Sequence, residues 1–363
     1  MRYPTQTATA AYAAAYELAQ GDADARRPGL PATMTTIAPA PSRPGPAVEV
    51  ERLVKTYPQP GGESFNAVDG ASFAVQPGEV FGFLGPNGAG KTTTLEIIEG
   101  IREPTSGRAA VLGLDSVSDR EEVKRRIGVQ LQAGAYFSLL TLEEILALFG
   151  SFYPRRLEPA ELLERVGLIE KRGAQVRHLS GGQARRFSVA AALVNDPDVV
   201  FLDEPTTGLD PQARRTVWEL VRSINRDEGK TVVITTHYME EAELLADRIA
   251  IIDRGRIQAI DTPEALIAQL DGAGKVRFAT DRHVELAELE QLAGVEAAVE
   301  TRASEVDGAG AYAYELRTPD AEGALVELLA WRQRDGASLR ALEVVPGTLE
   351  DVFIAVTGRE LRD

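Results

Sequence analysis

The chain has 363 residues, 44% of them hydrophobic and 26% charged, which is enough to bury one large core or two modest ones. The absence of cysteine excludes disulfide bonds and zinc-finger sites, and no run of about 18 uncharged apolar residues is available to span a bilayer. The net charge of −16 argues against a general nucleic-acid binder, because phosphate contacts require a basic surface. We expect two domains and no nucleic-acid partner, and any transport role requires a separate membrane chain.

The first 46 residues are rich in alanine, proline and threonine and show no lasting apolar period. Such a segment cannot bury enough apolar surface to offset the entropy lost on ordering, so residues 1–46 are expected to be disordered. A signal peptide is the alternative, although Glu17 and a weak apolar centre count against it. Met34, near the end of this segment, is a second candidate translation start beside Met1.

Two stretches after this extension alternate between apolar and polar residues, as strands do. Residues 48–51 are expected to form an edge strand, and residues 66–75 a second strand that ends in a Pro-Gly turn. Tyr57 lies between them. This aromatic residue either belongs to the core or the sheet edge, or offers a face on which an adenine stacks.

A glycine-rich loop then follows the apolar run of residues 80–84, and helical apolar spacing begins near residue 94. Residues 85–92 fit the pattern G-x-x-x-x-G-K-[ST] without a mismatch, in the strand, loop and helix context that this motif requires. Glycines let the backbone N–H groups point inward at a phosphate, and the helix adds its positive end. The motif predicts that Lys91 reaches the β- and γ-phosphates of a nucleotide and that the Thr92 hydroxyl binds Mg²⁺.

Two acidic residues follow a second apolar run. Residues 199–202 have the composition of a buried parallel strand, and Asp203 and Glu204 come directly after it. Because ligand groups gather at the carboxyl ends of parallel strands, both carboxylates should lie beside the phosphate loop. Asp203 is then expected to bind Mg²⁺ and Glu204 to polarise an attacking water. Another apolar strand, residues 231–234, leads to His237, for which we favour a γ-phosphate contact over a structural role.

A Ser-Gly-Gly-Gln stretch, residues 180–183, precedes a helix-forming run over residues 184–194 and offers a second anion site at a helix start. Placed shortly before the two carboxylates, it resembles the signature motif of ATP-binding cassette (ABC) ATPases. The resemblance extends over roughly residues 48–270. It implies an α/β P-loop NTPase cassette with a mixed-sheet core and a helical subdomain, and it implies binding of ATP and Mg²⁺.

The resemblance also implies a role for each motif. Residues 85–92 match the Walker A loop, residues 199–204 the Walker B strand with its catalytic glutamate, and residues 205–210 the D-loop. The Q-loop glutamine is assigned to Gln132, with Gln130 as the alternative because the aligned strand can slip by two residues. The implied catalytic residues are Glu204, His237 and Gln132, and the implied Mg²⁺ ligands are Thr92, Gln132 and Asp203. The implied ATP contacts are Tyr57, Gly85, Asn87, Gly88, Ala89, Gly90, Lys91, Thr92, Thr93, Ser180, Gly181, Gly182, Gln183 and Asp210.

One copy of each motif is only half of such a site. In ABC proteins the signature of one protomer closes on the ATP held by the Walker A loop of another, so that two cassettes enclose two nucleotides head to tail. The resemblance therefore implies a homodimer, or a heterodimer with a paralogue. Ser180 and Gly182 would contact the γ-phosphate in the other protomer.

Between the Q-loop and the signature, apolar spacing predicts helices over residues 142–149, capped by Thr141, and over residues 159–166. In the ABC family this region, residues 133–180, is the helical subdomain that receives a short helix of the membrane permease. Four apolar residues either make that contact or pack in the core of the subdomain: Tyr136, Phe137, Leu139 and Leu140.

A linker at residues 271–274 separates the cassette, residues 47–270, from a small α+β domain of the ferredoxin-like kind, residues 275–363. Its expected strands are residues 276–278, 311–316 and 339–344, and its expected helices are residues 284–292 and 320–332. The final run, residues 349–360, resembles the ending of daunorubicin-resistance-type drug and polyketide exporters, where it implies assembly or coupling to the permease. The alternative is a short helix that covers the core of this domain.

These features together predict the ATP-hydrolysing motor of a bacterial ABC exporter, bound at the cytoplasmic face of the membrane to a separate permease. The resemblance to drug exporters also suggests a role in antibiotic resistance. Two other classes stay open, namely the motor of an ABC importer and a soluble ABC ATPase that acts on ribosomes or DNA. The transported substrate contacts the membrane chain, so this sequence does not identify it.

Overall fold

The residues described by the computed structural model are 45–59, 61–130, 136–137, 139–270, 274–301, 312–345 and 347–358. The expected disordered extension therefore lies almost entirely outside the described residues, as do residues 271–273 of the expected linker. No helix within the described ranges is long and apolar enough to cross a membrane. These ranges contain three sheets.

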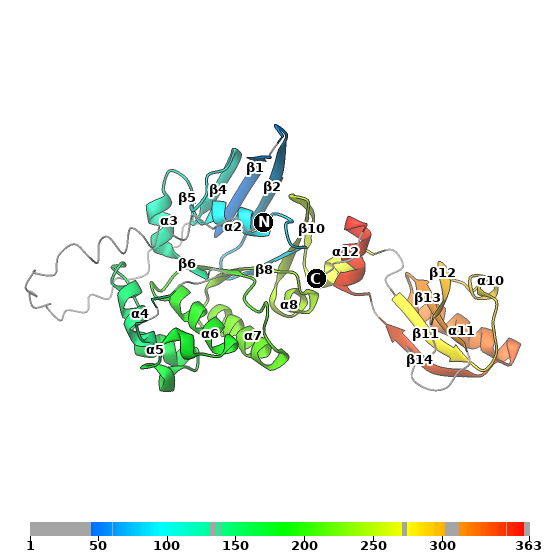
Figure 1. Ribbon diagram of the computed structural model, residues 1–363. Coiled ribbons are helices and arrows are strands. Elements are labelled where there is room, and N and C mark those ends of the chain that lie inside the picture. Colours follow the sequence, from blue (N-terminus) through cyan, green and yellow to red (C-terminus); the bar gives the residue numbers. More distant parts are fainter. Residues whose placement is uncertain are drawn as a thin grey trace, which may run out of the picture. The chain divides into compact units, whose positions relative to one another are not determined.

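A six-stranded sheet forms the centre of the cassette (Figure 1), with the spatial order β10-β9-β3-β8-β7-β6. All neighbouring strands are parallel except β10, which runs antiparallel to β9. The strands are β3 (Val80–Leu84), β6 (Ile127–Gln130), β7 (Val199–Asp203), β8 (Thr231–Thr236), β9 (Arg248–Asp253) and β10 (Arg256–Asp261). Every residue of β3, β7 and β8 is buried, which explains why continuous apolar runs predicted these strands.

Successive side chains of the central strands enter two different cores. Val199 and Phe201 of β7 pack in a core shared with helix α2 (Lys91–Ile98) and the second sheet. Val200 and Leu202 pack on the opposite face, among helices. The helices on that face are α4 (Leu142–Gly150), α5 (Pro159–Arg165), α6 (Gly181–Ala192) and α7 (Pro211–Arg226).

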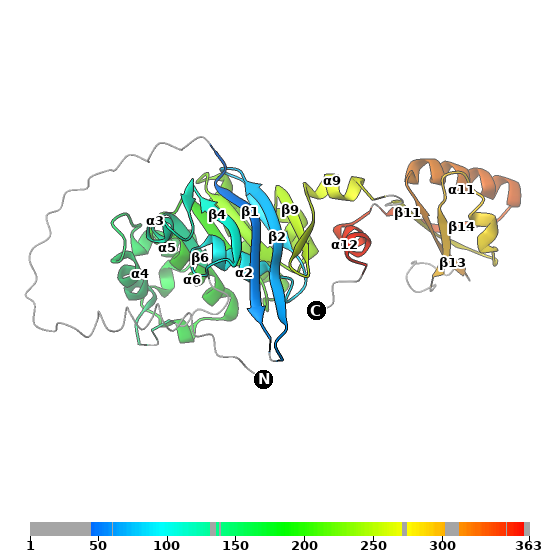
Figure 2. The ribbon, with the colours of Figure 1, turned by 90° about the horizontal axis from the view of Figure 1, so that it is seen from above.

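The second sheet is antiparallel and has the order β2-β1-β4-β5. Its strands are β1 (Val48–Pro58), β2 (Ser64–Val75), β4 (Ser106–Val111) and β5 (Leu114–Asp115). The expectation that residues 48–51 form an edge strand is wrong, because β1 lies between β2 and β4 (Figure 2). Alternation of apolar and polar residues shows only that one face of a strand is buried. A strand inside an antiparallel sheet has one buried face just as an edge strand does.

The helical subdomain begins as the sequence predicts. Thr141 caps α4 in a capping box, in which its hydroxyl accepts a hydrogen bond from Glu144 N and its own N–H donates to the Glu144 carboxylate. Of the four apolar residues just before α4, Tyr136 packs edge-on against Phe187 at 5.2 Å, and Leu140 joins the same core. Leu139, by contrast, is 78% exposed.

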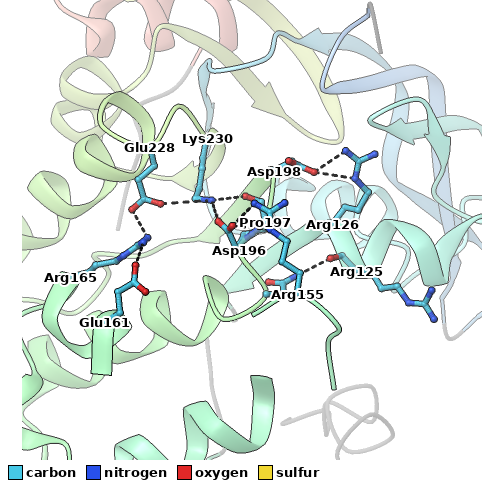
Figure 3. A network of polar contacts seen from close by, with 11 residues as sticks. Arg125, Arg126, Arg155, Glu161, Arg165, Asp196, Pro197, Asp198, Glu228 and Lys230 are labelled. Atoms are coloured by element: carbon cyan, nitrogen blue, oxygen red, sulfur yellow. Dashed lines mark hydrogen bonds and ion pairs between the residues drawn. The ribbon is translucent and has the colours of Figure 1, made fainter. Parts of the chain in front are cut away.

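A network of charged side chains joins the helical subdomain to the base of the central sheet (Figure 3). Lys230, just before β8, donates to Asp196 Oδ1 at 2.6 Å, and Arg155 Nε donates to Asp196 Oδ2 at 2.9 Å. Arg165 of α5 pairs with Glu228 at 2.8 Å. Burial acts to raise the pKa of Asp196, but its bonds with Lys230 and Arg155 outweigh this and lower the pKa below its ordinary value. The carboxylate therefore stays charged and holds cations from two parts of the cassette.

The third sheet is antiparallel with the order β12-β13-β11-β14, and it has a hydrophobic core of its own. Its elements run in the order expected of a ferredoxin-like fold: β11 (Gly274–Thr280), α10 (Leu286–Leu289), β12 (Ala297–Thr301), β13 (Tyr312–Thr318), α11 (Ala321–Asp335) and β14 (Leu339–Val345). The helix expected over residues 284–292 is only four residues long. Turns with i→i+3 hydrogen bonds follow this helix as far as residue 295. Such turns repeat with nearly the period of a helix, so the apolar spacing of the sequence fits them as well.

Helix α12 (Leu349–Thr357) packs against the cassette, not in the core of the third sheet. The alternative that it covers the C-terminal core is therefore wrong. Its buried side chains, Leu349, Val352 and Phe353, lie in one cluster with residues of β9, α8 (Met239–Leu245) and α9 (Pro263–Ala268). Leu349 N also donates to Glu243 Oε1 of α8 at 3.0 Å. Apolar spacing along α12 predicts a buried face but does not reveal which surface covers that face.

Candidate active site

The glycine-rich loop connects β3 to α2 through backbone positions that exclude side chains. A Cβ at Gly85 would lie 2.3 Å from the Ile252 carbonyl oxygen. At Gly90 the φ angle is 106°, and a Cβ would lie 2.2 Å from the Ala67 carbonyl oxygen. Helix α2 begins at Lys91, three residues before the apolar spacing begins, so Thr92 and Thr93 belong to its first turn. The loop is therefore held between β9 and β2, with its N–H groups at the start of a helix.

Lys91 folds back onto the loop that precedes it. Its Nζ donates to the carbonyl oxygens of Gly85 at 2.7 Å and Pro86 at 3.2 Å and lies 3.4 Å from Glu204 Oε1. Burial lowers the pKa of Lys91, while the charges of Glu204 and Asp203 oppose that shift. The ammonium group is thus placed within the loop where phosphate oxygens are expected.

Asp203, the last residue of β7, meets the start of α2. The Thr92 hydroxyl lies 3.1 Å from Asp203 Oδ2, and the Thr235 hydroxyl of β8 donates to Asp203 Oδ1. Burial raises the pKa of Asp203 above its ordinary value, and the two threonine hydroxyls oppose this shift. A carboxylate and a hydroxyl are hard oxygen ligands of the kind that Mg²⁺ prefers, so these residues fit that ion.

Glu204 has a left-handed backbone conformation, with φ of 47°, which turns its side chain away from the strand direction. Its N–H donates to the Thr235 carbonyl oxygen at 3.2 Å, and its Oε2 accepts from the Thr207 hydroxyl at 3.1 Å. His237 Nδ1 lies 3.5 Å from its Oε1. The interaction with His237 lowers the pKa of Glu204 to about 2, with the Lys91 charge acting in the same direction against the effect of burial. The carboxylate is therefore ionised at neutral pH and available to polarise a water.

The structure thus brings together five residues that sequence motifs predicted: Lys91, Thr92, Asp203, Glu204 and His237. Sequence reasoning assigned no role to Thr207 and Thr235, which hold the two carboxylates. No motif marks a threonine hydroxyl as a carboxylate partner. The only available signal was the position of Thr235 near the carboxyl end of β8.

The two candidate Q-loop glutamines differ in what the structure describes. Gln132 lies outside the described residues. Gln130 is the last residue of β6, is buried, and is paired with Leu202 of β7. The structure therefore leaves the Q-loop assignment as a prediction.

Tyr57 lies near the end of β1, directly opposite Phe65 of β2. The two rings stack with centroids 5.7 Å apart. The cations of Lys55 and Arg102 lie 5.5 and 5.4 Å from the Tyr57 ring centroid. Its surroundings are aromatic and cationic, which suits an adenine next to a polyphosphate.

The signature residues form a second group at the starts of α6 and α7. Ser180 is the N-cap of α6, and its hydroxyl accepts from Gln183 N at 3.3 Å, while its N–H donates to Gln183 Oε1 at 3.0 Å. Gly181 and Gly182 are the first residues of α6, so this helix starts three residues earlier than expected. Asp210 caps α7 by accepting from Ala213 N at 2.9 Å. A hollow of about 230 Å³ lies between the two helix starts.

Comparison with known proteins gives consistent matches. The family model for ABC transporters matches residues 68–207. The chain is 42% identical to Nod factor export ATP-binding protein I of Paraburkholderia xenovorans (strain LB400) over 327 residues, which cover 88% of this chain and 100% of that protein. It is 40% identical to the protein of that name from Rhizobium meliloti over 326 residues, 88% of this chain and 90% of that protein. The ATP-binding cassette MJ0796, solved as a dimer bound to ADP and Pi, is 28% identical with a TM-score of 0.54, covering 59% of this chain and 98% of that chain.

Proposed function

Since the chain belongs to the ATP-binding proteins of ABC transporters, and is therefore an ATPase subunit of a transporter, we propose that the transport it drives is export. The support is that relatives aligned along most of both chains are named for the export of Nod factors. Membership of the daunorubicin-resistance-type branch, with a drug or polyketide as substrate, is a narrower proposal. It rests on the resemblance of residues 349–360 to the ending of those exporters.

The observation that carries the proposed mechanism is the group of Lys91, Thr92, Asp203, Glu204 and His237 around the phosphate loop. Lys91 and the loop N–H groups would bind the β- and γ-phosphates. Thr92 and Asp203, with Gln132, would hold Mg²⁺, which neutralises phosphate charge when bound. Glu204 would polarise the attacking water, and His237 would contact the γ-phosphate.

The remaining ATP contacts are proposed to come from both protomers of a dimer. The loop residues and Tyr57 would bind one ATP within a protomer. The starts of α6 and α7 would bind the ATP of the partner, and the capping box supports this because it leaves the Ser180 hydroxyl proton free to donate. The proposed contacts in the partner's site are Ser180, Gly181, Gly182, Gln183 and Asp210. The partner is a second copy of this chain or a paralogue.

The arrangement along the chain follows from this proposal. Residues 47–270 would form the nucleotide-binding domain and residues 275–363 an accessory domain. The helical subdomain would contact a membrane permease, which would hold the protein at the cytoplasmic face of the membrane. Leu139, exposed beside α4, and the partly buried Phe137 are the candidate permease contacts, whereas Tyr136 and Leu140 pack internally.

The variant Glu204→Gln tests the proposed chemistry. The amide keeps the size of the side chain but polarises water poorly, so ATP turnover should fall by about 10²- to 10⁴-fold. ATP binding should persist, because Lys91 and the loop are intact, and the ATP-bound dimer should accumulate. Turnover is measured by phosphate release, and dimerisation by light scattering with and without ATP.

A matched control is Glu79→Gln, which changes a buried glutamate remote from the five site residues and paired with Arg248. It should leave turnover within about twofold of the wild type if the variant folds. Ordinary ATPase rates in Glu204→Gln would contradict the catalytic assignment.

A further inference from the structure

Helix α7 begins directly after the D-loop, and its first turn contacts the segment that carries His237. The guanidinium carbon of Arg214 lies 4.2 Å from the ring centroid of Tyr238. The Tyr238 ring lies in turn 4.2 Å from the His237 imidazole, at an interplanar angle of 43°. Since His237 Nδ1 is 3.5 Å from Glu204 Oε1, these side chains form a continuous row from α7 to the carboxylate of the site.

Two features fix this row in place. The Tyr238 N–H donates to the Thr236 hydroxyl at 2.9 Å, which holds the backbone directly after His237. The Arg214 Nε atom is buried and has no hydrogen-bond partner among the described residues. The face of the Tyr238 ring is therefore a principal contact of the guanidinium, and a cation over an aromatic face is attracted more strongly where water is excluded.

A second contact joins α7 and the D-loop to α8 beside this row. The Glu241 side chain is almost fully buried, at 1% exposure, and its Oε1 accepts from the Thr206 hydroxyl at 2.8 Å and Trp218 Nε1 at 2.9 Å. Burial raises the pKa of Glu241, and the Thr236 hydroxyl and the charge of Arg214 are among the groups that oppose this shift, so this carboxylate is coupled to the row. The control is supplied by Arg222 of α7, whose Nη2 donates to the Leu244 carbonyl oxygen of α8 at 2.9 Å and so joins the same two helices away from the row.

We propose that Tyr238 is a positioning residue for His237 and that Arg214 holds Tyr238, so that the start of α7 sets the orientation of the histidine toward the γ-phosphate. The inference rests on the proposed function of His237. Because Asp210, the N-cap of α7, belongs to the proposed dimer contact, the row connects that contact with the histidine of the same protomer. Breaking the row misplaces the imidazole during hydrolysis and leaves the phosphate loop unchanged.

The test compares four variants of the full chain with the wild type. Tyr238→Ala removes the ring and Arg214→Gln removes the cation, so each should lower kcat about tenfold while KM for ATP stays within about twofold. Tyr238→Phe keeps the ring and should retain turnover close to that of the wild type. Arg222→Gln removes the bond to Leu244 and should change the melting temperature but not kcat.

A spectroscopic measurement separates positioning from a general loss of stability. The chain has three histidines, so the imidazole NMR signals of His237 are identified by their loss in His237→Ala. Tyr238→Ala and Arg214→Gln should both shift these signals, because both move or remove a ring that lies against the imidazole. Arg222→Gln should not shift them. If Tyr238→Ala fails to fold, Arg214→Gln provides the same comparison.

Unchanged kcat in both Tyr238→Ala and Arg214→Gln, or an equal loss of kcat in Arg222→Gln, would overturn the proposal. A rise in KM without a fall in kcat would do so as well, because it would place Tyr238 in nucleotide binding. Glu204→Gln distinguishes this failure from failure of the proposed function. If Glu204→Gln is inactive while the row variants turn over normally, only the positioning proposal is wrong, and if Glu204→Gln is active, the proposed chemistry is wrong.

Discussion

Glu99 is a buried acid that the proposed mechanism does not use. It caps the end of α2 and is 4% exposed. Burial raises the pKa of Glu99 to about 8, and the negative charges of Asp203 and Glu96 act in the same direction. At neutral pH the folded protein therefore holds a proton at Glu99 that the unfolded chain has released.

This proton makes stability depend on pH, and the sign follows from the direction of the shift. Between the ordinary pKa of 4.5 and the folded pKa of about 8, the unfolded chain binds fewer protons than the folded protein. Glu99 therefore lowers the free energy of unfolding by an increasing amount as pH rises through this window. Above the window the effect stays constant. In Glu99→Gln this dependence is lost.

We expect the stability advantage of Glu99→Gln over the wild type to grow by roughly 1–3 kcal/mol from pH 6 to pH 8, since one pKa unit corresponds to about 1.4 kcal/mol. Urea unfolding of both proteins at the two pH values, without nucleotide or Mg²⁺, measures the difference. Glu121→Gln, at an exposed position, is the control and should run parallel to the wild type. If Glu99→Gln also runs parallel, Glu99 does not hold the proton.

At the residue scale, sequence reasoning succeeded where one short segment carries the whole signal. The phosphate loop and the two carboxylates at the end of β7 were predicted because strand ends and glycines mark them locally. The Arg214–Tyr238 contact and the threonines that hold the carboxylates join distant segments. Their residue types are ordinary at those positions, so only the folded arrangement reveals them.

At the scale of elements, the charged network in Figure 3 determines how the helical subdomain is attached to the sheet. Lys230 is almost buried, and Asp196 is a partner that it shares with Arg155. Asp196 also adopts a left-handed backbone conformation, with φ of 47°, which asparagine tolerates as well as aspartate does. The substitution Asp196→Asn therefore removes the charge without straining the backbone.

We expect Asp196→Asn to lower the free energy of unfolding by about 2–3 kcal/mol, because Lys230 loses the nearer of its two carboxylate partners and Arg155 loses its partner as well. Glu161→Gln is the control. Glu161 pairs with Arg165 at an exposed position of α5, and its loss should cost less than about 1 kcal/mol. Denaturant unfolding of both variants measures this difference. Equal losses in the free energy of unfolding would show that Asp196 contributes no more to stability than an exposed ion pair does.

The elements themselves were predicted unevenly, for reasons of packing. Strands β3, β7 and β8 were predicted and are confirmed, because parallel strands buried on both faces have unbroken apolar runs. The prediction that β1 is an edge strand was wrong, because alternation of apolar and polar residues does not show how many strands pair with it. Strand β12 was not predicted, because its apolar run, residues 297–299, is only three residues long and does not alternate with polar residues.

At the scale of the whole molecule, the proposed composite site makes catalysis depend on association. Turnover per protomer should rise with protein concentration until the dimer dominates, because each ATP needs the α6 start of another copy. Phosphate release measured over a wide dilution series tests this expectation. Binding of ADP, which needs only the phosphate loop, should show no such dependence and serves as the control. Turnover that stays flat across the range in which dimers form would count against the shared site.

Helix α12 gives the C-terminal part of the chain a second attachment to the cassette, in addition to the covalent connection between Leu270 and Gly274. A protease that cuts this connection would therefore leave two fragments that still hold together through Leu349, Val352 and Phe353. A gene truncated after β14 would have the opposite effect, because the surface of α8 and α9 that these side chains cover would face water. Shortened versions of this protein should consequently aggregate more readily than nicked ones.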